Sequence, residues 1–285
     1  NSSDEYFITG GSWEDTYYLY GDFGSVPGFY SSNTLGFRCI KNLVMVKNDP
    51  AATSINKDHK VETYKPVSEL EYKKLLTYYK YDKQPLNAEV ISREEKDDWI
   101  EEKIEFDCSL GDRITGFLFL PKNVQEPFQC IVWDPHGAVY DLGAPANWTA
   151  EILFSGNIKA GRAVFVLVPK GSPSRKWEYG EQWPDVSTVL FRDRVLHGVT
   201  ESRIGMDYLS TRKEIDMNKL TWIPTSHMIN GLIVPAVDNR INSIVLIACG
   251  IYPESKTSLP EVNTVNFVSH YNKPTYFLYG KYDEI

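Results

Sequence analysis

The runs Cys130-Ile131-Val132-Trp133 and Ala163-Val164-Phe165-Val166-Leu167-Val168 decide the fold class of this sequence. Both are continuously apolar, which is typical of strands that helices cover on both faces of a parallel sheet. Residues 148–159 lie between them and have the length of a crossover helix. The three segments therefore predict a strand–helix–strand unit of an α/β sheet.

The same alternation continues on both sides of this unit. Residues 103–106 and 116–120 predict a hairpin around the turn Gly111-Asp112, and residues 189–210 predict a long helix with one apolar face. Further apolar strands are expected at 220–223, 243–249 and 275–279. The sequence therefore predicts a doubly wound, mostly parallel α/β sheet.

Length, charge and hydropathy exclude several classes of function. The 285 residues carry a formal charge of −8, and no Lys/Arg cluster offers the basic surface that nucleic acids require. No apolar run approaches the roughly 20 residues of a membrane-spanning helix. The four cysteines, Cys39, Cys108, Cys130 and Cys249, form no CxxC pair and lie near no histidine at ligand spacing. We expect no metal and no other cofactor, and the cysteine spacing decides no disulfide.

The chain divides into three regions by composition. Residues 1–47 are rich in Gly, Tyr and Ser, and residues 48–97 form a polar linker with one helix. That helix begins with a capping box, Ser68-x-x-Glu71, and buries a stripe at helical spacing, which suits a packing role. Residues 98–285 form the α/β domain. The start at Asn1 reads as an internal cut and carries no targeting segment, so the compartment stays open.

A candidate nucleophile follows the strand that ends at Ile223. The residues Pro224-Thr225-Ser226-His227-Met228 lie between a strand and a helix, where α/β-hydrolases carry the nucleophile elbow G-x-S-x-G. Pro224 and Met228 replace both glycines, and Met228 is expected to crowd the neighbouring strand and helix. A lone serine after a strand is more often a helix N-cap, so both interpretations stay open.

Oxyanion-binding groups are expected in the loop after Trp133. Its sequence is Asp134-Pro135-His136-Gly137-Ala138, and Gly137 would let the backbone approach a substrate. The N–H of Ala138 would act together with the N–H of His227, the residue after the nucleophile. The alternative is a turn that only redirects the chain.

The sequence offers a candidate for the acid of a catalytic triad but none for the base. Asp283 follows the last predicted strand, where the acid belongs, but no histidine follows it before Ile285. The histidines present are His59, His136, His197, His227 and His270, and none stands where a triad histidine is expected. Without a base, Ser226 would be a weak nucleophile.

Residues 169–188 form a long aromatic loop over the expected catalytic edge of the sheet. Trp177, Tyr179 and Trp183, together with His136, are candidates for binding a sugar or a peptide. The alternative for the aromatic residues is a lid that packs on itself.

Residues 98–283 resemble the dienelactone-hydrolase and acetyl-xylan-esterase side of the α/β-hydrolases. The likeness is greatest to a hydrolase module at the C-terminus of bacterial multidomain proteins, often with a kinase domain upstream. It implies an α/β-hydrolase fold with Ser226 as nucleophile and Asp283 as acid. The segments that carry it are Tyr81-Asp82-Lys83-Gln84-Pro85-Leu86-Asn87-Ala88, Phe119-Leu120-Pro121-Lys122-Asn123, Phe191-Arg192-Asp193, Asp207-Tyr208-Leu209-x-Thr211-Arg212, Pro235-Ala236-Val237-x-x-Arg240-Ile241 and Leu259-Pro260-Glu261-Val262-x-x-Val265-Asn266-Phe267.

Residues 1–47 resemble the end of a formylglycine-generating-enzyme-like (sulfatase-modifying-factor) domain. The likeness lies in Gly10-Gly11-Ser12-Trp13 and Leu35-Gly36-Phe37-Arg38-Cys39. That family's oxidising chemistry uses a cysteine pair after the first motif, and residues 14–32 contain no cysteine. A binding or scaffold role is therefore expected for residues 1–47. The resemblance weakly favours a bacterial protein located outside the cytoplasm.

Two functional hypotheses follow. The first is a catalytically impaired hydrolase fold kept for binding or assembly with a protein partner. The second is an active serine esterase that cleaves a carbohydrate or small-molecule acyl ester, with the triad histidine lying beyond Ile285.

Overall fold

The computed structural model describes residues 5–9, 23–27, 31–36, 65–135, 137–140, 142–180, 184–226, 229–251 and 257–279. The chain separates into two compact units, Asn1–His59 and Lys60–Ile285. In the smaller unit, β1 (Glu5–Thr9) pairs antiparallel with β2 (Phe23–Pro27). Most of the two motifs that carry the sulfatase-modifying-factor resemblance lies outside the described residues.

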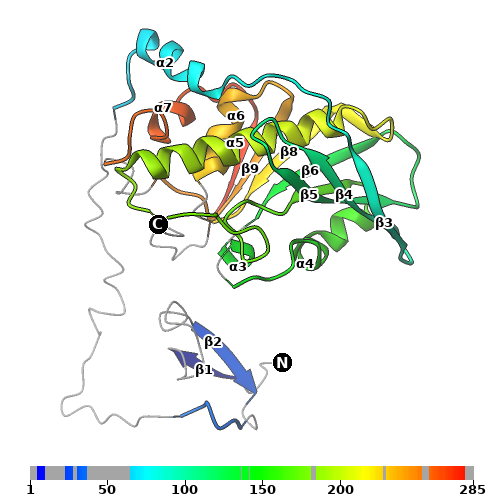
Figure 1. The fold of residues 1–285 in the computed structure, drawn as a ribbon. Coiled ribbons are helices and arrows are strands. Elements are labelled where there is room, and N and C mark those ends of the chain that lie inside the picture. The colour runs from blue at the N-terminus through cyan, green and yellow to red at the C-terminus, as the bar shows by residue number, and fades with distance from the viewer. Residues whose placement is uncertain are drawn as a thin grey trace, which may run out of the picture. The chain divides into compact units, whose positions relative to one another are not determined.

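The larger unit is built on an eight-stranded mixed sheet (Figure 1). The strand order is β10-β9-β8-β6-β7-β5-β4-β3, with parallel pairing from β10 to β7 and antiparallel pairing from β7 to β3. The expected doubly wound α/β sheet is confirmed. The strands are β3 (Glu89–Glu95), β4 (Trp99–Asp107), β5 (Arg113–Pro121), β6 (Phe128–Asp134), β7 (Ala163–Leu167), β8 (Ile215–Pro224), β9 (Ile241–Ile247) and β10 (Thr275–Leu278).

The two runs that predicted the fold are the central neighbours β6 and β7. Ala163, Val164, Phe165 and Val166 are all 0% exposed, which requires cover on both faces of the sheet. The predicted hairpin is also present as β4 and β5. β3 was not anticipated, because its seven residues are all exposed and lack the apolar alternation of a half-buried strand.

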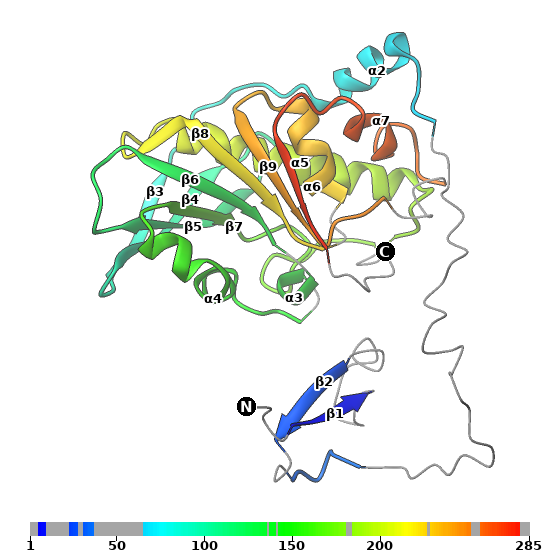
Figure 2. The same ribbon diagram turned by 180° about the vertical axis from the view of Figure 1, so that it is seen from behind.

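Helices cover both faces of the sheet (Figures 1 and 2). One face carries α5 (Val189–Leu209), α6 (Ile229–Val237), α7 (Val265–Val268), and α2 (Glu69–Leu75) with its 3₁₀ extension η2 (Leu76–Tyr79). The other carries α3 (Gly137–Tyr140) and α4 (Ala146–Lys159). Each face has its own apolar core, so the sheet separates two hydrophobic layers.

The helix in the polar linker forms as its sequence predicts. The Ser68 hydroxyl accepts the Glu71 N–H, and the Glu71 carboxylate accepts the Ser68 N–H, which completes the capping box. Tyr72, Leu75 and Tyr79 are buried in the core of the larger unit. None of the described helices has both the length and the apolar character needed to cross a membrane.

Candidate active site

Ser226 lies at a sharp turn between β8 and α6. Its φ is +65°, in the left-handed region that a serine adopts only at a cost of about 1–3 kcal/mol. Its N–H donates to the carbonyl of Ile247 at 2.9 Å, which ties the turn to the end of the neighbouring strand β9. An N-cap residue normally has extended backbone, so this conformation differs from that of a simple cap and has the strained backbone that the sequence led us to expect at Ser226.

The turn at Ser226 forms although Pro224 stands where a nucleophile elbow would have its first glycine. Pro224 is the last residue of β8, and Gly231 of α6 lies against its ring. A Cβ added at Gly231 would lie 2.3 Å from the Pro224 Cβ. The space that a glycine at 224 would leave is therefore provided from the helix side by Gly231. Met228, where we expected crowding, lies outside the described residues.

Thr225 joins the ends of the neighbouring strands β8 and β6 next to the turn at Ser226. Its N–H and its hydroxyl both donate to the Asp134 carbonyl at 3.2 Å, and its hydroxyl accepts the Trp133 indole N–H at 3.1 Å. Trp133 and Thr225 are both buried. These bonds hold the end of β8 against the end of β6, so the start of the elbow is rigidly supported.

The candidate oxyanion loop leaves the neighbouring strand at the same edge. Asp134 of β6 and Pro224 of β8 are register partners, so Gly137 and Ala138 follow β6 where Ser226 follows β8. Both residues are half-buried and lie in the short helix α3, near the ends of β8 and β9 in both views (Figures 1 and 2). His136 and His227, the other residues predicted here, lie outside the described residues.

The two histidines in the described part of the chain, His197 and His270, form hydrogen bonds and ring contacts with residues other than Ser226. His197 lies in α5 with its Nε2 3.2 Å from the Glu201 carboxylate. His270 stacks on Tyr72 with ring centroids 3.5 Å apart and pairs with Glu69 at 3.0 Å. It therefore helps to hold α2. His59 and the predicted acid Asp283 lie outside the described residues.

The aromatic loop contains one residue packed on the protein and one exposed to solvent. The Trp177 ring lies beneath the guanidinium of Arg194, 4.8 Å from its centroid, and meets the His197 ring edge-on at 5.1 Å. Tyr179 is 74% exposed, and its carbonyl accepts a bond from Arg194 at 2.8 Å. Tyr179 is therefore the more accessible ring. Trp183 lies outside the described residues.

Asp134 is a buried acid beside the elbow that the sequence did not single out. It is 5% exposed, and its Oδ2 has no hydrogen-bond partner within the described part of the chain. Burial raises the pKa of its carboxyl to about 7. An unpaired buried carboxyl marks a candidate functional site. Its position after an apolar run was the available signal, but the desolvation depends on α6 covering it.

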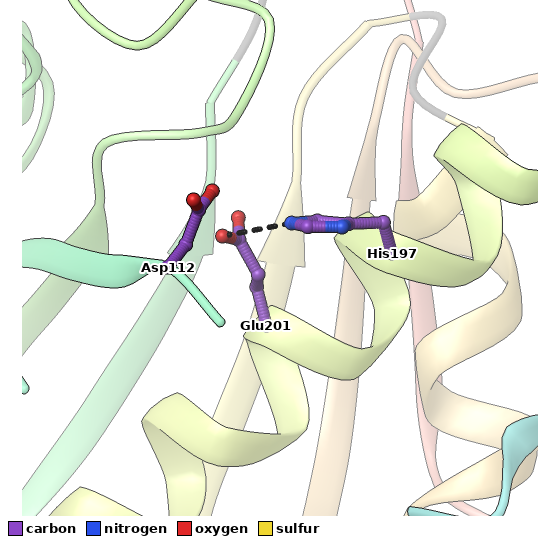
Figure 3. Close-up of side chains that lie close together, drawn as sticks. All are labelled: Asp112, His197 and Glu201. Carbon is purple, nitrogen blue, oxygen red and sulfur yellow. Dashed lines mark hydrogen bonds and ion pairs between the residues drawn. The ribbon is translucent and has the colours of Figure 1, made fainter. Parts of the chain in front are cut away.

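Asp112, His197 and Glu201 come together at the same edge of the sheet (Figure 3). One possible ligand atom from each lies within 4.8 Å of the others, which is the spacing of a metal site. However, Lys170 pairs with Asp112 at 2.7 Å and Arg175 with Glu201 at 2.6 Å. The protein's own cations thus balance both carboxylates, and we describe the group as an ion-pair network.

The Glu201 carboxylate is the centre of this network. Its burial alone would raise the pKa, but hydrogen bonds from His197 and Arg175 and the charge of Arg175 outweigh that effect and lower the pKa. Because Glu201 stays ionised, it can only accept hydrogen bonds, and the His197 Nε2 must carry the proton. The network therefore fixes both the orientation and the tautomer of the imidazole.

Comparisons with known proteins support the fold. No family model matches the chain. The Bacillus subtilis protein named "Putative hydrolase YtaP" is 22% identical over 181 residues, and the match covers 58% of this chain and 58% of YtaP. The chain therefore spans little more than half the length of that relative.

Two solved esterases share the architecture. An acetyl xylan esterase from Paenibacillus sp. R4 has a TM-score of 0.55 at 13% identity, covering 77% of this chain and 90% of that one. Acetyl xylan esterase 1 from Thermoanaerobacterium sp. JW/SL YS485 has a TM-score of 0.52 at 13% identity, covering 75% and 79%. The larger unit has an esterase-like α/β-hydrolase fold. At this identity the likeness extends to the fold alone.

Proposed function

We propose that this chain carries the nucleophile of a serine carboxylic-ester hydrolase that acts on an acyl ester of a carbohydrate. The observation that carries the proposal is the left-handed backbone of Ser226. Strained backbone of this kind is found mostly at functional sites, and a purely structural role does not require it at the serine that follows β8. The proposed substrate class rests on the printed names of the two structural neighbours, which are acetyl xylan esterases.

The chemistry follows from the edge of the sheet. The Ser226 hydroxyl attacks the ester carbonyl, and its proton passes to a triad histidine that Asp283 orients. The N–H groups of Ala138 and His227 stabilise the oxyanion, with Gly137 allowing close approach. The sugar alcohol leaves with the proton, and water then hydrolyses the acyl-serine. His136, Trp177, Tyr179 and Trp183 are the proposed substrate contacts.

A second candidate is a binding or assembly module that keeps the hydrolase fold without catalysis. It is favoured by the engagement of His197 and His270 in other contacts and by Pro224 at the first glycine position of the elbow. For residues 1–47, the proposal remains a binding or scaffold role of a sulfatase-modifying-factor-like segment. Neither role requires a cofactor.

Fluorophosphonate labelling of the full natural polypeptide separates the two candidates. The esterase proposal expects a stoichiometric adduct at Ser226, located by peptide mass spectrometry and lost in Ser226→Ala. Ser210→Ala is the matched control, because this exposed hydroxyl only caps the end of α5. No adduct on protein with native circular dichroism would reject the esterase and leave the binding module.

A further inference from the structure

A groove of about 370 Å³ lies between α5 and the segment 78–84. The segment 78–84 forms one wall, α5 contributes Asp193 and His197, and the turn between β4 and β5 closes it at Ser109. All of these residues belong to the larger unit. The volume is within the range of small-ligand sites.

The groove lies toward the edge of the sheet that carries Ser226. β5 begins at Arg113, and its Gly116 pairs with Leu167 at the carboxyl end of β7, so the β4–β5 turn lies at that edge. Next to His197, Gly198 packs against Asn230, four residues after Ser226, at a distance that leaves no room for a Cβ. The groove and Ser226 therefore lie at the same edge of the sheet, on neighbouring helices that are in direct contact.

An accessible aromatic ring forms part of the wall. Tyr78 is 47% exposed, and the Arg192 guanidinium lies 5.9 Å from its ring centroid. Tyr81 is held in place, because its hydroxyl donates to Asp207 at 2.7 Å and Arg203 lies 4.8 Å from its ring. A flat, apolar ring face with a fixed neighbour is suited to stacking against a planar or ring-shaped ligand.

Several polar groups of the wall are available. Asp82 and Gln84 are exposed and form no hydrogen bond within the described part of the chain. The Ser109 hydroxyl also has no partner there, but its oxygen is buried, so it offers no contact to a ligand in the groove. The His197 ring is held by Glu201 (Figure 3). Arg175 in turn contacts Glu201 through both carboxylate oxygens, at 2.6 and 3.2 Å. A polar side chain that is already fixed before binding can orient a ligand with little loss of its own conformational entropy.

The charges of the groove select neither anions nor cations. Lys80 and Asp82 both line the groove and carry opposite charges, and Asp193 is paired with Arg192 at 2.7 Å. A ligand with many hydroxyl groups, flat apolar faces and no charge fits this mixture of a tyrosine ring, an amide and a carboxylate. The neutral rings of an oligosaccharide have this chemistry.

We propose that the groove formed by Tyr78, Asp82, Gln84, Asp193 and His197 binds neutral sugar rings of the substrate's carbohydrate chain. The proposal rests on the proposed function, since it assigns the part of the substrate remote from the ester. Tyr78 stacks on a ring, and Gln84 and Asp82 bond its hydroxyl groups. Binding here contributes affinity for long substrates over short ones.

Isothermal titration of the full chain with xylohexaose tests the proposal, because an oligosaccharide without an ester needs no catalysis. We expect saturable binding that Tyr78→Ala and Gln84→Ala each weaken about tenfold, the change expected for losing one good contact. Tyr276→Ala removes a tyrosine that is 64% exposed on β10 and should change nothing. Circular dichroism of each variant excludes unfolding as the cause.

The results of the titration and of the labelling test the two proposals, sugar binding in the groove and esterase activity at Ser226, independently. Absent binding, binding that both variants leave unchanged, or binding of oligogalacturonate in preference to xylohexaose would each overturn the groove. Fluorophosphonate labelling of Ser226 is unaffected by these results. Binding without labelling would support the groove and reject catalysis.

Discussion

Gly231 lies against Pro224, and a Cβ at Gly231 would come within 2.3 Å of the proline Cβ and 2.9 Å of the Asp134 Oδ2. The indole of Trp222 also donates to the Gly231 carbonyl at 2.9 Å. The helix after the elbow is thus held at its closest approach to the central strands. The proline on the strand and the glycine on the helix are complementary in shape.

Gly231→Ala should therefore destabilise the larger unit by about 1–3 kcal/mol, because the proline ring cannot move aside. Urea unfolding measures the effect. Gly156→Ala is the control, since its Cβ in α4 would meet nothing within 4 Å. That change should raise stability by up to about 1 kcal/mol through helix propensity. Equal effects at both sites would contradict the packing described.

Ser226→Gly should be more stable than Ser226→Ala by about 1 kcal/mol. Alanine keeps the cost of the left-handed φ of +65°, whereas glycine removes it. The comparison by thermal and urea unfolding needs no substrate. If the two variants have the same stability, the serine is not held in a strained conformation.

Asp134 should make the larger unit less stable as the pH rises. Burial raises its pKa from 3.8 to about 7, so the folded state binds a proton that the unfolded state has released between these values. Its stabilising contribution is present below pH 3.8 and is lost as the pH rises toward 7. The loss is at most about 4 kcal/mol.

Asp134→Asn should remove this dependence and stabilise the protein at pH 8, because an amide resembles the protonated acid in shape and carries no charge. Urea midpoints between pH 4 and 8 give the measurement. Asp97→Asn is the control at an exposed position. A variant with the pH profile of the native protein would show that Asp134 is not desolvated.

Arg175→Ala should cost about 3–5 kcal/mol, because it leaves the buried Glu201 carboxylate without its main cation. The Arg175 and Glu201 side chains are 10% and 3% exposed. Arg192→Ala, which breaks the more solvent-accessible pair with Asp193 (side chains 22% and 55% exposed), should cost less than about 1 kcal/mol. Chemical denaturation compares the two, and similar costs would argue against a buried network.

The larger strands and helices could be predicted from the sequence because their signals are local. The capping box at Ser68, the one-sided helix 189–210 and the apolar runs of β6 and β7 each carry enough information within a few residues. β3 could not be predicted in this way. It is a polar edge strand that exists through its hydrogen bonds to β4.

In the candidate site, too, some features follow from the local sequence and others depend on tertiary contacts. The position of Ser226 between a strand and a helix is determined by the sequence alone, because the apolar pattern changes on either side of it. Its left-handed backbone was decided by tertiary contacts, since the bond to Ile247 and the fit of Gly231 on Pro224 join segments distant in the chain. The raised pKa of Asp134 and the network around Glu201 likewise exist only after burial, because desolvation and charge pairing depend on neighbours that the linear sequence does not identify.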